Sequence, residues 1–368
     1  MRTWLYSAQR IVAVAVLGLG AMGGSASAGA LRLNDDRLAN GVVGWGADDH
    51  GQVSIPADLS DVTAVAAGQD HSLALKADGT VVAWGDNMFG EATVPPGLSG
   101  VVAIASGFNH SLALTADGTV IGWGQNSGGQ ATPPQGLTGV TAIAAGGGFS
   151  LALRGDGTVV AWGDDLFGQT EVPAGLSGIM AIGAGTYHSL AVRTDGTVVQ
   201  WGGYEIGTPQ GNHPTPPPGL SNVRAVAGGR NHSIALLLDG SIVEWGAHGQ
   251  VDSPAGLSGI TRIAAGNDHS LALRADGTVV SWMAVATAGP LGVEDRGQAN
   301  VPPGLAGVLA IAGGFHHSLA VAAVVPAIPI TGISIIGQLV VGAGLLSIGM
   351  LAVALGRGRA DRRRRPTA

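Results

Sequence analysis

Apolar and polar positions alternate in short blocks that recur along most of the chain. One clear unit begins with the apolar run Val101–Ala105, continues through His110–Leu114 and returns along Val120–Trp123. Apolar runs of this length, bounded by glycine and polar residues, are typical of short β-strands that are buried on both faces. Asp117-Gly118 stands between the second and third runs and supplies the residues with positive φ that a tight hairpin needs. Each unit therefore predicts three antiparallel strands.

The segment after the third run has a different character. Gly124–Gly129 is a polar loop, and Thr132-Pro133-Pro134 follows it. Because proline cannot donate to a central hydrogen-bond ladder, we expect this segment to form a short strand at the outer edge. Three regular strands and one short edge strand are typical of a propeller blade.

Tryptophan marks the period of the repeat. Successive repeat tryptophans are 39, 39, 39, 39, 44 and 37 residues apart, and a period near 40 indicates a propeller or a solenoid. A large ring at a fixed register fills the wedge between neighbouring sheets, so we predict that these residues are buried packing residues. They are Trp45, Trp84, Trp123, Trp162, Trp201, Trp245 and Trp282.

The two ends of the repeat region complement each other. The last His-Ser-Leu segment begins at His317 and stops at Val321, with no Asp-Gly turn and no tryptophan after it. The first recognisable segment, Asn40–Gly46, supplies the missing turn, return strand and Trp-Gly. Pairing of the two half-repeats would remove the free sheet edges that an open array exposes. The sequence thus predicts an all-β, seven-bladed propeller over residues 40–321.

The repeat also resembles a known family. Units such as HSLALKADGTVVAWGDNMFGEATVPPGLSGVVAIASG resemble the regulator-of-chromosome-condensation type of propeller repeat in its short bacterial form. The resemblance covers about Asn40 to Val321 and extends to the secreted propeller inhibitors of β-lactamases. In that inhibitor family, target binding uses aromatic residues of the rim loops, which is what the resemblance implies here. A propeller hosts unrelated activities, so the fold alone assigns none.

Composition narrows the class of protein further. The 368 residues include 63 glycines and no cysteine, which fits a turn-rich fold and excludes disulfides, thiolate metal sites and cysteine nucleophiles. The net charge of −7 is unevenly distributed along the chain. Eight arginines lie near the two ends, and the rest of the chain has 10 basic and 24 acidic residues. An acidic body repels phosphate backbones, so we expect no nucleic acid as partner. Guanine-nucleotide exchange, known for eukaryotic relatives of the family that the repeat resembles, fits an exported acidic protein poorly, so we expect no guanine nucleotide either.

The N-terminus has the pattern of an export signal. Arg2 and Arg10 give a positively charged N-terminal region, Ile11–Met22 is apolar, and Ala26-Ser27-Ala28 offers a small-residue cleavage site. We predict a signal peptide over residues 1–28 and a linker over 29–39. An uncleaved membrane anchor is the alternative, although the apolar stretch is short for a span.

The C-terminus predicts a membrane anchor. Ile328–Gly356 contains no charged residue, and an arginine cluster follows directly, which places this end in the cytoplasm. We predict a linker over 322–329, a transmembrane helix over 330–356 and a cytoplasmic tail over 357–368. The tail resembles bacterial PEP-CTERM sorting signals, but Val325–Pro329 lacks their Pro-Glu-Pro signature. The protein is therefore predicted to be exported to the cell envelope or surface on a single-pass anchor, with release by a sorting peptidase as the alternative.

Strand direction decides which loops share a face of the propeller. The loops before His-Ser-Leu and after Trp-Gly are predicted to share one rim, and the Asp-Gly turns the other. The phenylalanines and the tyrosines of the exported part gather in the first group, as do the extended segments 203–218 and 283–295. Aromatic side chains on loops of a rigid scaffold are typical of a binding surface, although they could instead fill gaps between blades. The candidates are Met88, Phe89, Phe108, Phe149, Asp165, Phe167, Tyr187, Tyr204 and Phe315.

Catalytic and metal chemistry find little support. Each repeat histidine adjoins a serine, but adjacent strand residues point to opposite faces and cannot form a nucleophile–base pair, so a hydrogen-bonding role is predicted. Asp48-Asp49-His50 and Asp164-Asp165 lack the spacing of a calcium loop. We expect no catalytic residue, metal or cofactor, and a protein or other exported ligand as partner. The alternatives are an envelope enzyme with a site at the channel, a structural surface protein and a β-lactamase-inhibitor-like binder.

Overall fold

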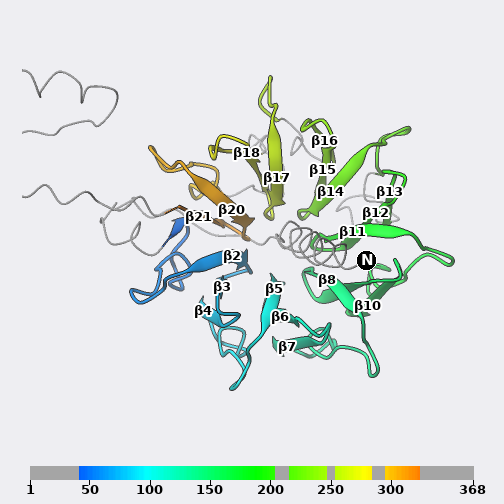
Figure 1. Ribbon diagram of the computed structural model, residues 1–368, viewed down its shortest axis with the longest axis horizontal. Coiled ribbons are helices and arrows are strands. Elements are labelled where there is room, and N and C mark those ends of the chain that lie inside the picture. Colours follow the sequence, from blue (N-terminus) through cyan, green and yellow to red (C-terminus); the bar gives the residue numbers. More distant parts are fainter. Residues whose placement is uncertain (1–40, 204–214, 247–252, 284–294, 324–368) are drawn as a thin grey trace, which may run out of the picture. The chain divides into compact units, whose positions relative to one another are not determined.

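The computed structural model describes residues 41–203, 215–246, 253–283 and 295–323. In these segments 21 strands form seven three-stranded antiparallel sheets, arranged as blades around a central axis (Figure 1). The prediction of an all-β, seven-bladed propeller is confirmed. The predicted signal peptide, first linker, transmembrane helix and tail lie outside the described residues. Within those residues, no helix is long and apolar enough to cross a membrane.

Each blade consists of an inner, a middle and an outer strand. The inner strands, nearest the axis, are β2 (Val62–Ala67), β5 (Val101–Ser106), β8 (Val140–Ala145), β11 (Ile179–Ala184), β14 (Val223–Gly228), β17 (Ile260–Ala265) and β20 (Val308–Gly313). The middle strands are β3 (His71–Lys76), β6 (His110–Thr115), β9 (Phe149–Arg154), β12 (His188–Arg193), β15 (His232–Leu237), β18 (His269–Arg274) and β21 (His317–Ala322). The outer strands are β4 (Val81–Gly85), β7 (Val120–Gly124), β10 (Val159–Gly163), β13 (Val198–Gly202), β16 (Ile242–Gly246), β19 (Val279–Met283) and β1 (Val42–Gly46).

The seventh blade is built from both ends of the repeat region. Strand β1 pairs antiparallel with β21, with Val42 opposite Val321 and Gly46 opposite His317. The order β1-β21-β20 reproduces the outer, middle and inner strands of every other blade. The pairing of complementary half-repeats is confirmed, and the ring closes without a free half-blade.

The predicted fourth strand is wrong. Each sheet in the described part of the chain has three strands, and Thr132-Pro133-Pro134 lies in a run of turns after β7. Pro133 and Pro134 have no N–H to donate to β7, and the Leu137 N–H instead donates to the Pro134 carbonyl at 3.1 Å. The chain therefore turns back toward the axis without extending the sheet.

The hydrophobic core lies between blades. Trp123 packs with Leu73, Leu75 and Val81 of the preceding blade, in one of seven clusters of this kind. All seven repeat tryptophans are 3 to 8% exposed. The predicted packing role of the tryptophans is confirmed, because each ring fills the wedge between two sheets.

A buried histidine–serine hydrogen bond joins neighbouring blades at six of the seven interfaces. His71 Nε2 lies 3.0 Å from Ser111 Oγ in the next blade, and that hydroxyl donates to the Glu91 carbonyl at 3.0 Å. The same carbonyl accepts the Trp123 indole N–H at 2.8 Å. Because the serine proton is directed to the carbonyl, the histidine donates through Nε2. The same histidine–serine contact recurs at His110–Ser150, His188–Ser233, His232–Ser270, His269–Ser318 and His317–Ser72.

The ring of histidine–serine contacts has one break. Phe149 stands where the other blades have histidine, and it is fully buried at the start of β9. Ser189 of the next blade still donates to the Gln169 carbonyl at 2.7 Å. The third blade therefore keeps the carbonyl contact and fills the histidine position with an apolar ring.

The buried histidines predict a pH-dependent stability. Burial lowers the pKa of His71 and His269 from 6.5 to about 3, and that of His110 to about 4. The unfolded chain binds more protons below pH 6.5, so stability is full above that pH and is lost as the pH falls toward 3 to 4. Each histidine adds a slope of up to about 1.4 kcal/mol per pH unit to the free energy of unfolding, measured by urea denaturation. His110→Phe should reduce the slope of the free energy of unfolding against pH. An unchanged slope would contradict its assignment to the buried histidines.

The break at Phe149 predicts a tolerated substitution. Phe149→His places a ring nitrogen beside the Ser189 hydroxyl, as in the other blades, so the free energy of unfolding should change by less than about 1 kcal/mol. Phe149→Ala leaves a cavity and should cost about 3 to 5 kcal/mol. Denaturant titration of both variants measures the difference, and equal losses would show that the third blade has a different local geometry.

Candidate functional site

Two sets of loops form one rim of the propeller, called here the loop rim. Inner loops join the inner and middle strands, and outer loops follow the outer strands. They are hydrogen-bonded to each other, as where the Gln125 N–H donates to the Asn109 carbonyl at 2.7 Å and the Asp164 N–H to the Gly148 carbonyl at 2.9 Å. The predicted sharing of one rim by these loops is confirmed by these contacts.

A buried side chain shapes five of the outer loops in the described part of the chain. Glu91 accepts the Phe89 N–H at 2.8 Å, and Gln169 accepts the Phe167 N–H at 2.8 Å through its side-chain oxygen. These residues fix the backbone beneath the loop tip, so the preceding apolar side chain is displayed outward. Gln52, Gln130 and Gln298 make the same contact in other blades.

The inner loops meet at the axis in a closed ring of backbone hydrogen bonds. The Gln69 N–H donates to the Phe108 carbonyl at 3.0 Å, and the Phe108 N–H donates to Gly147 at 3.2 Å. The ring closes where the Phe315 N–H donates to the Gly68 carbonyl at 3.3 Å. The intervening bonds run from Gly147 to Thr186, Thr186 to Gly229, Arg230 to Asn267 and Asn267 to Gly314.

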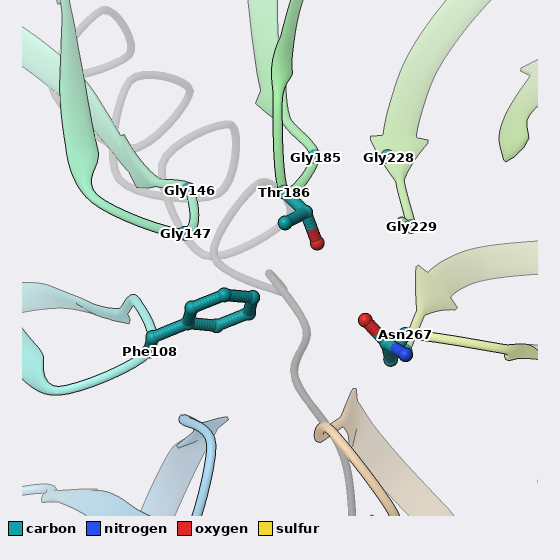
Figure 2. A pocket seen from close by; sticks show the side chains of 9 residues that line it. Phe108, Gly146, Gly147, Gly185, Thr186, Gly228, Gly229 and Asn267 are labelled. Atoms are coloured by element: carbon teal, nitrogen blue, oxygen red, sulfur yellow. The ribbon is translucent and has the colours of Figure 1, made fainter. Parts of the chain in front are cut away.

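The ring leaves a very small axial cavity. Its volume is about 10 Å³, which is room for about one water. Figure 2 shows Phe108, Thr186 and Asn267 directed toward the axis from three blades. Asn267 is 2% exposed, and its side-chain oxygen has no hydrogen-bond partner among the described residues.

A larger hollow adjoins this cavity on the loop rim. It measures about 400 Å³ and shares Phe108, Gly147 and Thr186 with the axial cavity. Phe108 and Tyr187 also line it, together with Asp164. We call it the rim hollow, and its remaining lining residues are Gln125, Ser127, Gly128, Gln130 and Gly148.

Glycine opens the rim hollow. The third inner loop reads Gly146-Gly147-Gly148, where the neighbouring blades place Phe108 or Tyr187 at the same loop positions. With no side chain on Gly147 or Gly148, space remains between the two aromatic residues. A Cβ on Gly148 would meet nothing closer than the Asp164 Cβ at 3.4 Å.

The structure separates the predicted rim residues into groups. Phe108 packs edge to face on Phe315 with centroids 5.2 Å apart, and Phe167 packs in the same way on Tyr187 at 5.0 Å. All four are half-buried. Asp165 is exposed and accepts the Thr170 N–H at 2.8 Å, which gives it a role in loop structure.

The most exposed apolar residues form two projecting tips. Met88 is 77% exposed and Phe89 46%, on the outer loop of the first blade, and Leu166 is 75% exposed on that of the third. The second outer loop between them carries Ser127 and Gly128 at the corresponding positions, which line the hollow. The rim therefore presents two apolar tips, on the first and third blades, and a rim hollow lined by the second, third and fourth blades.

One candidate was assigned to the wrong place. Phe149 is fully buried in the histidine position of the third blade and cannot contact a partner. The prediction treated it as a loop residue, but it begins strand β9 and its ring packs on Gly146. Tyr204 and most of the two extended segments lie outside the described residues.

Sequence reasoning missed several residues of the site. Asp164, Leu166 and the pair Gly147–Gly148 were not among the candidates. The glycine run is visible in the sequence as a departure from the repeat, as is the recurring glutamine or glutamate seven residues after tryptophan. Alignment of the repeats to one another would have shown both signals.

Charge is distributed unevenly between the two rims. In the described segments the loop rim has nine carboxylates against two arginines, Arg230 and Arg296, and Arg296 is paired with Asp49 at 2.8 Å. The carboxylates are Asp48, Asp49, Asp70, Asp86, Glu91, Asp164, Asp165, Asp268 and Asp295. The other six described basic residues lie near the opposite rim: Lys76, Arg154, Arg193, Arg224, Arg262 and Arg274. The loop rim is therefore acidic.

Burial affects two of these acids. It raises the pKa of Asp70 and of Glu91 above their ordinary values. In the described part of the chain, no group of three His, Asp or Glu side chains is placed to hold a metal ion.

Comparison with known proteins agrees with this architecture. The Regulator of chromosome condensation (RCC1) repeat matches residues 62–91, 101–130, 140–169 and 260–282. A search of curated proteins found no match. The fold and these matches define the class of protein as a repeat propeller, in which four of the repeats match the RCC1 repeat.

Solved structures support the same fold. Prp20p from Saccharomyces cerevisiae is 17% identical with a TM-score of 0.64, covering 84% of this chain and 94% of that chain. Human WBSCR16 is 20% identical with a TM-score of 0.58, covering 71% and 87%. The ectodomain of the Arabidopsis thaliana receptor kinase ACR4 is 22% identical with a TM-score of 0.55, covering 75% and 99%.

The glycine run predicts two contrasting substitutions. Gly148→Asn places a side chain in the open hollow and should change the free energy of unfolding by less than about 0.5 kcal/mol, as for most surface substitutions. Gly147→Ala places a Cβ 2.7 Å from the Thr186 carbonyl and should be more destabilising, by about 1 to 3 kcal/mol. Denaturant titration compares them, and a larger loss for Gly148→Asn would mean that the hollow is closed in solution.

Proposed function

We propose that this protein is an exported, membrane-anchored propeller that binds a protein partner through its loop rim. The observation that carries the proposal is the pair of apolar tips, Met88-Phe89 and Leu166, on outer loops held rigidly from below. Exposed apolar side chains cost solubility when they gather, and they gain free energy when a partner covers them. Rigid loops also lose little entropy on binding.

Two further observations favour a binding function. The axial cavity has room for about one water, so among the described residues the channel itself is too narrow to hold a substrate. A similar yeast propeller, RCC1 (Prp20), has been solved with Kap60 bound, which shows that this class of fold can carry a protein partner. The export and the anchor rest on the N-terminal signal pattern and on the uncharged stretch Ile328–Gly356 before the arginine cluster.

Site-directed photo-crosslinking in cells that express the full-length chain tests the proposal. A photoreactive benzoylphenylalanine replaces Phe89 in one version and Leu238, exposed at an Asp-Gly turn of the opposite rim, in a second. Discrete adducts with another protein should form from position 89 and not from position 238. Adducts of the same pattern from both positions, or none from position 89, would contradict a rim-specific partner.

A matched pair of variants separates specific binding from general stickiness. Met88→Ser with Leu166→Ser removes the two most exposed apolar side chains of the loop rim and should abolish the adducts from position 89. Leu238→Ser with Leu309→Ser removes an equal number of exposed apolar residues from the other end of the blades and should leave them unchanged. Loss of adducts in both pairs would point to a folding effect and count against the rim.

A further inference from the structure

We infer that the rim hollow is a pocket for a lysine side chain of the partner protein. The inference rests on the proposed function and names the chemistry that this rim would recognise. It follows from the walls of the hollow, its floor and the charge around it, none of which depends on the exposed tips.

The walls suit the stem and the charge of a lysine. Phe108 and Tyr187 both line the hollow, and glycine separates them at the third inner loop. Aromatic faces attract a cation and also pack against the aliphatic stem of lysine. Asp164 stands at the same hollow, exposed, and no basic side chain in the described residues forms an ion pair with it.

The floor suits an ammonium group. The hollow adjoins the axial cavity at Phe108, Gly147 and Thr186, and that cavity is about the size of one water. Figure 2 shows the Thr186 and Asn267 side chains directed toward it. The buried Asn267 oxygen has no described donor, so an N–H donor would satisfy it.

Size and charge together select lysine. An ammonium head is compact and has three donors, whereas guanidinium is a wide planar fork that a water-sized cavity does not admit. The lining includes no lysine or arginine, and the surrounding loop rim has nine carboxylates against two arginines in the described residues. A neutral or acidic side chain would gain nothing from this field.

Fluorine NMR on the full-length chain tests the inference with small probes. The chain has three tyrosines, so labelling with 3-fluorotyrosine gives few resonances, and Tyr187→Phe assigns the one of interest. The probes are N-acetyl-lysine N-methylamide, its Nε-acetylated form and N-acetyl-arginine N-methylamide. The lysine probe should shift the Tyr187 resonance in a saturable way and bind more tightly than the other two.

Two variants test the groups assigned to the charge. Asp164→Asn keeps an acceptor oxygen for the loop and removes the carboxylate, so the lysine probe should bind about two- to fivefold more weakly. Asp165→Asn makes the same change one residue away, outside the hollow, and should leave the affinity unchanged. Thr186→Val removes a floor acceptor and should also weaken binding about two- to fivefold.

The outcomes separate this inference from the proposed function. Equal binding of the lysine and Nε-acetylated probes, equal or tighter binding of the arginine probe, or an unchanged affinity in Asp164→Asn would overturn the lysine pocket. Those results would leave the crosslinking from position 89 intact if the rim binds a partner by its apolar tips alone. Absence of both the crosslinks and the probe response would overturn both.

Discussion

At four of the described interfaces, one carbonyl group in the outer loop holds two neighbouring blades together. In the first two described interfaces, the Gln52 and Glu91 carbonyls each accept a serine hydroxyl and a tryptophan indole from the next blade. Both donors are buried, so losing the acceptor would leave two polar groups unsatisfied in the core. The carbonyl can serve both only if the outer loop keeps its shape, and the buried Glu91 or Gln52 side chain keeps it. The shape of the outer loop therefore determines both the packing between blades and the geometry of the rim.

This constraint explains why the rim can vary without loss of the ring. The backbone of these outer loops is fixed by residues that point inward. The side chain at the tip points away from the loop and does not hold its shape. Met88, Ser127 and Leu166 occupy corresponding places at three tips and have little in common. Tip residues can therefore differ from blade to blade at small cost in stability.

Much of the fold follows from the sequence alone. The blades are predicted by the tryptophan period and the Asp-Gly turns, because the same strand pairing and interblade packing recur in every repeat. Their closure is predicted by the complementary ends at Asn40–Gly46 and His317–Val321. The fourth strand is a wrong prediction: the proline position is typical of an edge strand, but Pro133 and Pro134 lack two donors for pairing with β7, and the segment forms turns instead.

The site followed from the sequence only in part. The alternating direction of the strands predicts that Phe89, Phe108, Phe167 and Tyr187 share one rim. The exposure of each side chain depends on how neighbouring loops pack, and the strand pattern carries no information about that packing. Phe149 shows where prediction from the sequence fails. A residue at a strand boundary lies in the core or on the rim depending on whether the strand begins at that residue or one position later. The rim hollow is open because glycine has no side chain. A sequence search that looks for functional side chains does not select glycine.

The third blade also gives the ring an orientation. Seven equivalent blades would present a partner with seven equivalent ways to sit, and a complex without a fixed geometry. Phe149 and Gly146-Gly147-Gly148 make one blade unlike the rest, both in its interior and at its loop. If a partner contacts this blade, as proposed, its orientation on the ring is fixed by that difference.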